Sequence, residues 1–208
     1  MVRIKPILFN TDMVKAILDG RKTVTRRICK DGNNYTVPDM GFYDADRRTY
    51  AVHSYADKEH TDKLSLAERP CPVCLGDILY VRETWSQTTD LFGESPEYIY
   101  RSDSGMMGGT IWRPSIHMPK EAARIWLKVK DVRVERLCNM KLDDFLSEGV
   151  CIRPEAFNDP ENAYMQARDE FIAIWDSTVS KGQQGLYGWT ASPWVWVIEV
   201  ERCGKPEE

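Results

Sequence analysis

The chain alternates between two hydrophobic patterns, one with a period of two residues and one with the period of a helix. Short stretches rich in aromatic and β-branched side chains predict strands. These stretches are residues 3–9, 22–29, 78–81, 98–100 and 194–200. Residues 123–137 alternate as well, but their apolar positions change from odd to even numbers near Asp131. That change predicts a β-bulge or a tight turn between two strands.

Three other segments carry apolar residues at helical spacing. The first occupies residues 11–20 and is expected to stop at Gly20. The second is a short helix over residues 142–148 that stops at Gly149. The third begins at Asp159-Pro160, with proline in the first helical position. Its predicted apolar stripe comprises Tyr164, Ala167, Phe171, Ile174 and Trp175.

The order of these elements predicts the fold class α+β, because strands and helices follow one another without the rhythm of βαβ units. We expect a small closed or nearly closed β-barrel of mixed and antiparallel strands with peripheral helices. Residues 1–208 are expected to form one domain. Residues 30–70 are polar and lack a sustained period, so they are interpreted as an insertion or a long flexible excursion, with a small hairpin around Arg48 to His53.

The amino-acid composition favours a soluble globular protein. Hydrophobic residues make up 42% and charged residues 29% of the chain, which is typical of a soluble globular domain. No apolar run reaches the roughly 18 residues of a transmembrane helix, and the N-terminus lacks a signal-peptide pattern, so we expect a cytoplasmic protein without membrane contact. The net charge of −4 argues against a general nucleic-acid coat but allows a local basic groove.

Six cysteines are expected to be reduced in such a protein. Cys71-Pro-Val-Cys74 has the spacing of half a zinc site, and His53 and His60 lie upstream. A second CxxC or an HxxxH pair, which a zinc site would normally add, is missing from the sequence. A turn closed by Pro72 is the favoured interpretation, and no metal or organic cofactor is expected.

The segment Gly20-Arg21-Lys22-Thr23-Val24-Thr25-Arg26-Arg27, here called the basic motif, follows the first predicted helix. Lys22 and Thr25 are three residues apart, so a turn can bring amine and hydroxyl to one side. Lysine acts as a base or nucleophile only when its pKa falls well below about 10.4, and the neighbouring guanidiniums favour that change. Spacing alone nevertheless favours a solvated basic turn.

Glu83 follows the apolar strand 78–81. Next to Lys22 it would hold the amine or transfer a proton, although an exposed residue at a strand end is the commoner case. Arg82 is expected to face the opposite side, and Trp85 follows two residues later.

Two further segments offer candidate binding residues. Ser115 and His117 lie between two prolines, in a segment rigid enough to line a pocket. Trp194 enters the last strand and has a ring that can stack on a base. The structural alternative is that the histidine is a satisfied structural residue and that the tryptophan closes one end of a barrel.

These motifs resemble a known family. Gly20-x-Lys22-x-x-Thr25-x-Arg27 resembles the GxKxxTxR signature of the ASCH domain superfamily, whose barrel is related to the PUA RNA-binding domain. Gly76-Asp77-x-Leu79-x-Val81-x-Glu83 resembles the second motif of that family. The opening Lys-Pro-Ile-Leu-Phe, the central Arg-Pro-Ser-Ile-His-Met-Pro and the closing Pro-Trp-Val-Trp-Val-Ile are similar to a longer subgroup found in bacteriophages and prophages.

The resemblance implies that the partner is a nucleoside, a nucleotide or RNA. One bacterial branch hydrolyses N4-acetylcytidine, and its catalytic residues correspond to Lys22, Thr25 and Glu83 here. The implied mechanism has Thr25 attack the acyl carbon, Lys22 take its proton and Glu83 orient Lys22, with Lys22 as nucleophile in an alternative version. The expected substrate-binding residues are Arg21, Arg26, Arg27, Arg82, Trp85, Ser115, His117 and Trp194.

Two alternatives remain open at this point. The same cleft can bind RNA or a modified nucleotide without chemistry, in which case affinity falls steeply with salt. Another branch of the family is linked to RNA cleavage, for which Lys22 and His117 would have to serve. The sequence leaves the oligomeric state open.

Overall fold

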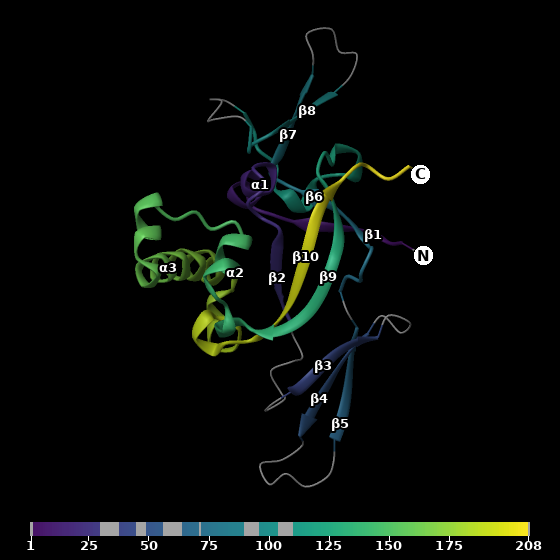
Figure 1. Cartoon of the computed structure of the whole chain (residues 1–208). Helices are drawn as coiled ribbons and strands as arrows, with labels where there is room; N and C mark the ends of the chain where they lie inside the picture. The colour runs from purple at the N-terminus through teal and green to yellow at the C-terminus, as the bar shows by residue number, and fades with distance from the viewer. Residues whose placement is uncertain are drawn as a thin grey trace.

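A computed structural model describes residues 2–29, 38–44, 49–55, 64–70, 72–89, 96–103 and 110–207. The fold is α+β and is built on a mixed five-stranded sheet (Figure 1). Its strands are β1 (Ile4–Leu8), β2 (Val24–Ile28), β6 (Ile78–Arg82), β9 (Trp126–Arg136) and β10 (Trp194–Cys203). The α-helices are α1 (Thr11–Leu18), α2 (Leu142–Ser147), α3 (Pro160–Thr178) and α4 (Gln184–Tyr187). Short 3-10 helices cover Ser115–His117, Lys120–Ala122, Leu137–Asn139, Pro154–Asn158, Lys181–Gln183 and Trp189–Ala191.

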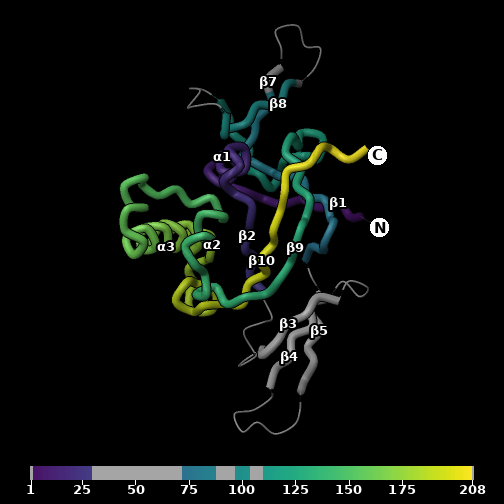
Figure 2. The backbone as a smooth tube through the Cα atoms, in the orientation of Figure 1, coloured from purple at the N-terminus to yellow at the C-terminus, as the bar shows by residue number. Residues whose placement is uncertain are grey.

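The strands of this sheet run in the order β1-β6-β9-β10-β2. β1 is parallel to β6, and the other neighbours are antiparallel. Opposite β10, the register changes so that Glu199 pairs with Asp131 and Val200 with Val129, which leaves Lys130 as an extra residue. The expected bulge near Asp131 is therefore confirmed, within one continuous strand rather than between two strands. Figure 2 follows the chain from β9 through α2 and α3 and back into β10.

Both faces of β10 are buried over Val195–Ile198, which explains the continuous apolar run of this strand. Val195 and Val197 of β10 pack in a cluster with residues of α2 and α3. Trp196 and Ile198 pack in a second cluster, which includes residues of α1. Figure 1 shows α2 and α3 together on one side of the curved sheet. The long excursion between β9 and β10 thus supplies one of the two layers that cover the sheet.

Two smaller sheets complete the described part of the chain. β7 (Trp85–Thr89) and β8 (Pro96–Tyr100) form a hairpin, and Trp85 packs at its base with Met118 and Trp126. β3 (Pro38–Asp44), β4 (Thr49–Tyr55) and β5 (Leu64–Pro70) form an antiparallel sheet in the order β3-β4-β5. The segment interpreted as an insertion or flexible excursion therefore contains three paired strands. Of the hairpin expected around Arg48 to His53, residues 49–53 lie within the single strand β4, and Arg48 lies outside the described residues.

The outcome for the fold class is mixed. The α+β prediction is confirmed. In the described part of the chain, β1 and β2 are the edges of the five-stranded sheet, and no strand pairing joins them into a closed barrel. No described helix combines the length and the apolar character that crossing a membrane requires.

Candidate functional site

Backbone contacts bring the basic motif against the end of α2. Lys22 N donates to Ala16 O of α1 at 3.0 Å, and Thr23 N donates to Ser147 O at 2.9 Å. Gly149 has a φ of +95°, and a Cβ there would lie 2.7 Å from the Cβ of Ala16. Only glycine permits this approach without displacing neighbouring atoms. The residue before this glycine, Glu148, is thereby fixed opposite the side chain of Lys22.

Lys22 and Glu148 form a buried ion pair. The side-chain Nζ donates to Glu148 Oε2 at 2.5 Å, to Glu148 O at 2.9 Å and to Val24 O at 2.8 Å. These three acceptors satisfy all three donors of an ammonium group. Lys22 is only 4% exposed and Glu148 8%. Burial lowers the pKa of Lys22, with contributions from the charges of Arg27 and Arg26, although the nearby Glu148 carboxylate acts to raise it.

Arg26 binds the second oxygen of the same carboxylate. Its Nη1 donates to Glu148 Oε1 at 3.3 Å, and its Nη2 donates to Asp144 Oδ1 at 2.8 Å and lies 3.7 Å from Glu135 Oε2. Both oxygens of Glu148 therefore contact cations. A buried carboxylate is energetically tolerable when its charge is offset in this way.

Arg27 lies on the opposite face of β2 from Arg26. Its Nη1 donates to Thr25 Oγ1 at 2.9 Å and to Arg26 O at 3.0 Å, and its Nη2 donates to Leu8 O at 3.1 Å. The guanidinium carbon lies 5.2 Å from the ring centroid of Phe9, and Lys22 Nζ lies 5.5 Å from the same centroid. Burial lowers the pKa of Arg27, and the Glu148 carboxylate acts against that shift.

A cavity of about 410 Å³ opens beside this network, here called the larger cavity. Its charged or polar lining residues are Asn10, Arg26, Arg27, Glu148 and Thr178. Pro6, Ile7, Leu8, Met13, Ile28, Phe171, Ile174 and Trp175 line the rest. A smaller cavity of about 180 Å³ shares five of these residues: Asn10, Met13, Glu148, Phe171 and Ile174. Glu148 is thus reached from both cavities, and Arg21 lines the smaller one.

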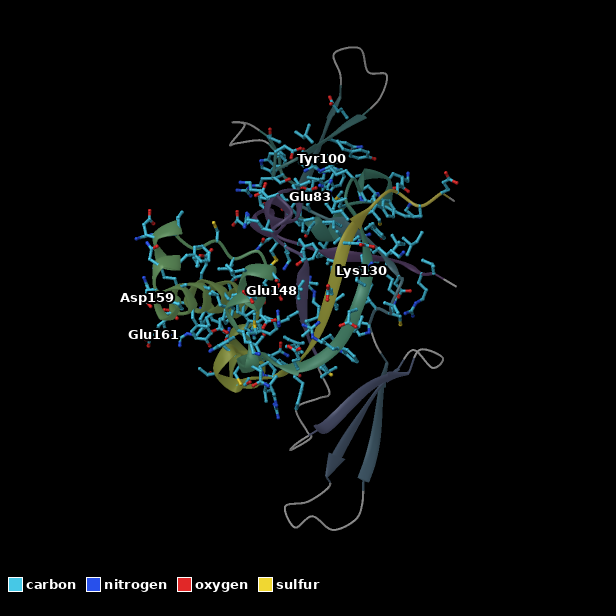
Figure 3. All side chains as sticks on the ribbon, in the orientation of Figure 1. Glu83, Tyr100, Lys130, Glu148, Asp159 and Glu161 are labelled. Carbon is cyan, nitrogen blue, oxygen red and sulfur yellow. The ribbon has the colours of Figure 1, made fainter. Side chains whose placement is uncertain are left out.

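Glu83 occupies a different environment. It is 1% exposed and accepts hydrogen bonds from Arg124 Nε at 2.9 Å and from Ser102 Oγ at 2.5 Å. Figure 3 shows Glu83 toward Tyr100 and the β7–β8 hairpin, whereas Glu148 lies beside α2. The carboxylate bound to Lys22 is therefore Glu148, and the expected pairing of Lys22 with Glu83 is not formed in this structure.

The remaining predicted binding residues lie away from both cavities. Arg82 donates to Ile116 O at 3.2 Å. Trp85 is buried under Arg113, whose guanidinium carbon lies 5.1 Å from its ring centroid. His117 is exposed and Ser115 half-buried, in the same 3-10 helix. Trp194 is covered by a guanidinium, that of Arg136, at 4.3 Å.

Sequence reasoning missed Glu148 although one signal was present. An acidic side chain at the C-terminal end of a helix opposes the helix dipole, so its position before Gly149 calls for a compensating partner. Phe171 and Trp175 were predicted as core residues of α3. Both are buried, with stacked rings whose centroids lie 6.0 Å apart, and both also line the larger cavity.

The half zinc site cannot be completed from the described residues, because Cys71 and His60 and the side chain of His53 lie outside them. Cys74 is buried, and its Sγ accepts a hydrogen bond from Arg3 Nη2 at 2.7 Å. Within the described ranges, no group of three or more His, Cys, Asp or Glu side chains is placed to hold a metal ion.

No family model, curated protein or solved structure matches this chain. The function is therefore inferred from the chemistry of the site. Its elements are a buried lysine–carboxylate pair, two guanidiniums and an aromatic-lined cavity that reaches the carboxylate.

Proposed function

We propose that the chain is an ASCH-type protein that hydrolyses an amide on an acylated nucleobase or nucleoside in the larger cavity. The observation that carries the proposal is the Lys22–Glu148 pair at the cavity wall. Buried ion pairs add little net stability to a fold. Groups with perturbed pKa values beside a cavity are common at catalytic sites. The aromatic rings of Phe171 and Trp175 offer an apolar wall for a base.

Glu148 is the member of the pair that lines the cavity, so we assign proton transfer to it. Its carboxylate takes a proton from water as the water oxygen attacks the acyl carbon. The C–N bond then breaks, and the proton passes to the leaving amine, which gives a free carboxylic acid and the unmodified base. Lys22 holds the carboxylate in place through the 2.5 Å contact.

Thr25 has a supporting position in this scheme. It is 1% exposed, and its Oγ1 accepts the hydrogen bond from Arg27, so the hydroxyl does not face the larger cavity in this structure. We therefore assign the attack to water rather than to Thr25. An acyl group trapped on Thr25 and detected by mass spectrometry would overturn this assignment.

The PUA-like barrel also belongs to the proposal. The sheet is strongly curved (Figure 1), and its two edge strands are linked by the hydrogen bond from Arg27 Nη2 in β2 to Leu8 O in β1. Such a link supports a barrel that is closed by side chains between these edges instead of by a β-ladder. A cytoplasmic location and a nucleoside, nucleotide or RNA partner are proposed with it.

Incubation of the purified protein with N4-acetylcytidine tests the activity, followed by the absorbance change on loss of the acetyl group. We expect turnover by the wild type and none by Lys22→Ala. Lys130→Ala is the matched control, because it removes an exposed lysine whose partner is the exposed Glu201. Failure of the wild type to hydrolyse this or related acylated nucleosides would contradict the proposal.

One observation favours a second function, the binding of RNA or a modified nucleotide without chemistry. All three donors of Lys22 are occupied, so the resting site has no free amine for a mechanism in which Lys22 is the base or the nucleophile. Binding without turnover, with an affinity that falls steeply as salt is raised, would support this second function.

A further inference from the structure

We infer that the main chain of Ile28, on the open edge of β2, reads the edge of the substrate base in the larger cavity. The N–H and C=O groups of this residue form an adjacent donor and acceptor. A cytosine acylated on its amino group presents the complementary pair, the acceptor N3 beside the donor N4–H, and hydrogen bonds to such an edge identify a base. The inference rests on the proposed function, because it takes the ligand to be an acylated base. It adds the groups that select that base.

The first observation is the direction of the main chain in β2. At one end of its pairing with β10, Cys29 N donates to Trp194 O at 2.9 Å. At the other end, Val200 N donates to Thr23 O at 2.8 Å. Between them the antiparallel register is continuous, and every second residue bonds to the partner strand. The odd-numbered residues of β2 therefore bond to β10, and the N–H and C=O groups of Ile28 point away from it.

The second observation is that Ile28 is left open on this side. β2 is an edge strand of the five-stranded sheet. Two earlier carbonyl groups on the same edge, those of Val24 and Arg26, accept hydrogen bonds from Lys22 Nζ at 2.8 Å and Arg27 Nη1 at 3.0 Å. Within the described part of the chain, neither the N–H nor the C=O of Ile28 has a partner. One donor and one acceptor are thus available next to each other.

The larger cavity lies along this open edge. Ile28 lines it, and so does Leu8 of the opposite edge strand, β1. Glu148 and the rings of Phe171 and Trp175 line the same cavity. Ile28 is half-buried, and main-chain groups that are removed from water usually have a hydrogen-bond partner. A base that packs on the aromatic wall, with its acyl group at Glu148, supplies that partner.

The test compares the affinities of cytidine and 3-deazacytidine, measured by calorimetry. The second ligand has a carbon in place of N3 and so lacks the acceptor for Ile28 N–H. We expect the wild type to bind cytidine about tenfold more tightly, the factor that one hydrogen bond supplies.

Ile28→Pro removes the N–H on the open side of the strand and leaves the hydrogen bonds to β10 in place. In this variant the two ligands should bind equally. Ile28→Val is the matched control, because it keeps the N–H and a β-branched side chain, and it should keep the ratio of the wild type.

Equal affinity of the wild type for both ligands would overturn the inference, as would a lack of cytidine binding or an undiminished ratio in folded Ile28→Pro. If Ile28→Pro fails to fold, an ester bond in place of the peptide bond between Arg27 and Ile28 decides. The ester removes the same N–H without the proline ring, so an unchanged ratio in that protein would overturn the inference and a ratio of about one would support it.

Hydrolysis of N4-acetylcytidine is measured in parallel, so that the two proposals can fail separately. Turnover by a wild type that binds cytidine and 3-deazacytidine equally would leave the proposed function standing and contradict only the role of Ile28. Discrimination between these ligands that is lost in Ile28→Pro, without any turnover, would support the role of Ile28 and contradict the hydrolysis.

Discussion

The surroundings of two buried carboxylates, Glu83 and Glu148, differ in whether a cavity reaches them. Both are less than a tenth exposed, and both contact an arginine. Glu83 is enclosed by Arg124 and Ser102, and it lines neither cavity. Glu148 lines both cavities and holds the amine of Lys22.

The difference shows that burial and pairing of a charge do not by themselves identify a reactive group. A carboxylate that is fully satisfied inside a protein stabilises the arrangement of its neighbours. It takes part in chemistry only where a ligand can reach it. The opening of the larger cavity onto Glu148 is therefore a better guide to a reactive carboxylate than the position of Glu83 within a sequence motif.

Exchanging each carboxylate for its amide gives the largest expected effects. Glu148→Gln should lower kcat/KM for N4-acetylcytidine by about 10²–10⁴-fold, because the amide cannot accept a proton. It should also destabilise the fold by about 3–5 kcal/mol, because Lys22 and Arg26 lose a buried partner. Glu83→Gln should reduce stability less, since Arg124 is partly exposed and keeps its contact with Asp103.

The activity per folded molecule shows which of the two carboxylates takes part in catalysis. Folded Glu83→Gln should retain the kcat/KM of the wild type, measured beside chemical unfolding curves for both variants. If Glu83→Gln abolished turnover while Glu148→Gln preserved it, the catalytic carboxylate would be Glu83, as the family resemblance implies.

Gly149→Ala tests the backbone that positions Glu148. The substitution forces a Cβ to within 2.7 Å of Ala16 Cβ at a φ of +95°, so we expect a loss of about 2–5 kcal/mol in the free energy of unfolding. Gly20→Ala is the control. Its φ is +77°, but no atom lies within 4 Å of the added Cβ. A loss as large in Gly20→Ala would show that backbone conformation, not close packing, dominates at Gly149.

The smallest expected effect is on the stability of the fold at acid pH, through the carboxyl group of Asp144. Burial acts to raise the pKa of Asp144, but hydrogen bonds from Lys141 N and Arg26, together with nearby positive charge, prevail and lower it from 3.8. A lowered folded-state pKa stabilises the protein above the unfolded-state pKa, and this contribution is lost as pH falls through the folded-state value. The effect should be modest because the carboxylate is only half-buried.

Chemical unfolding at a series of pH values measures this contribution. Asp144→Asn should flatten the decline of stability below about pH 4, because the titrating group is gone. Asp143→Asn, an exposed neighbour in the first turn of the same helix, should leave the decline unchanged. Identical pH profiles for wild type and Asp144→Asn would contradict the prediction.

The sequence by itself determined the elements whose cause is local. Stretches rich in aromatic and β-branched side chains predicted β2, β6 and β10, and the change of phase near Asp131 predicted the bulge at Lys130. Gly20 and Gly149 predicted two helix ends, and both adopt positive φ. The basic motif identified Lys22 and Arg27 as candidates. Each of these features depends on neighbours within a few residues, which a single sequence displays directly.

The tertiary structure decided which distant residues meet. Glu148 contacts Lys22 across more than a hundred residues, and α3 brings Phe171 and Trp175 to the same cavity. Glu83 was separated from Lys22 because its own strand end packs against Arg124 and the β7–β8 hairpin. The three strands within residues 38–70 lack an apolar period and were not predicted as a sheet. Contacts of this kind depend on the packing of whole layers, and local hydrophobic pattern does not encode them.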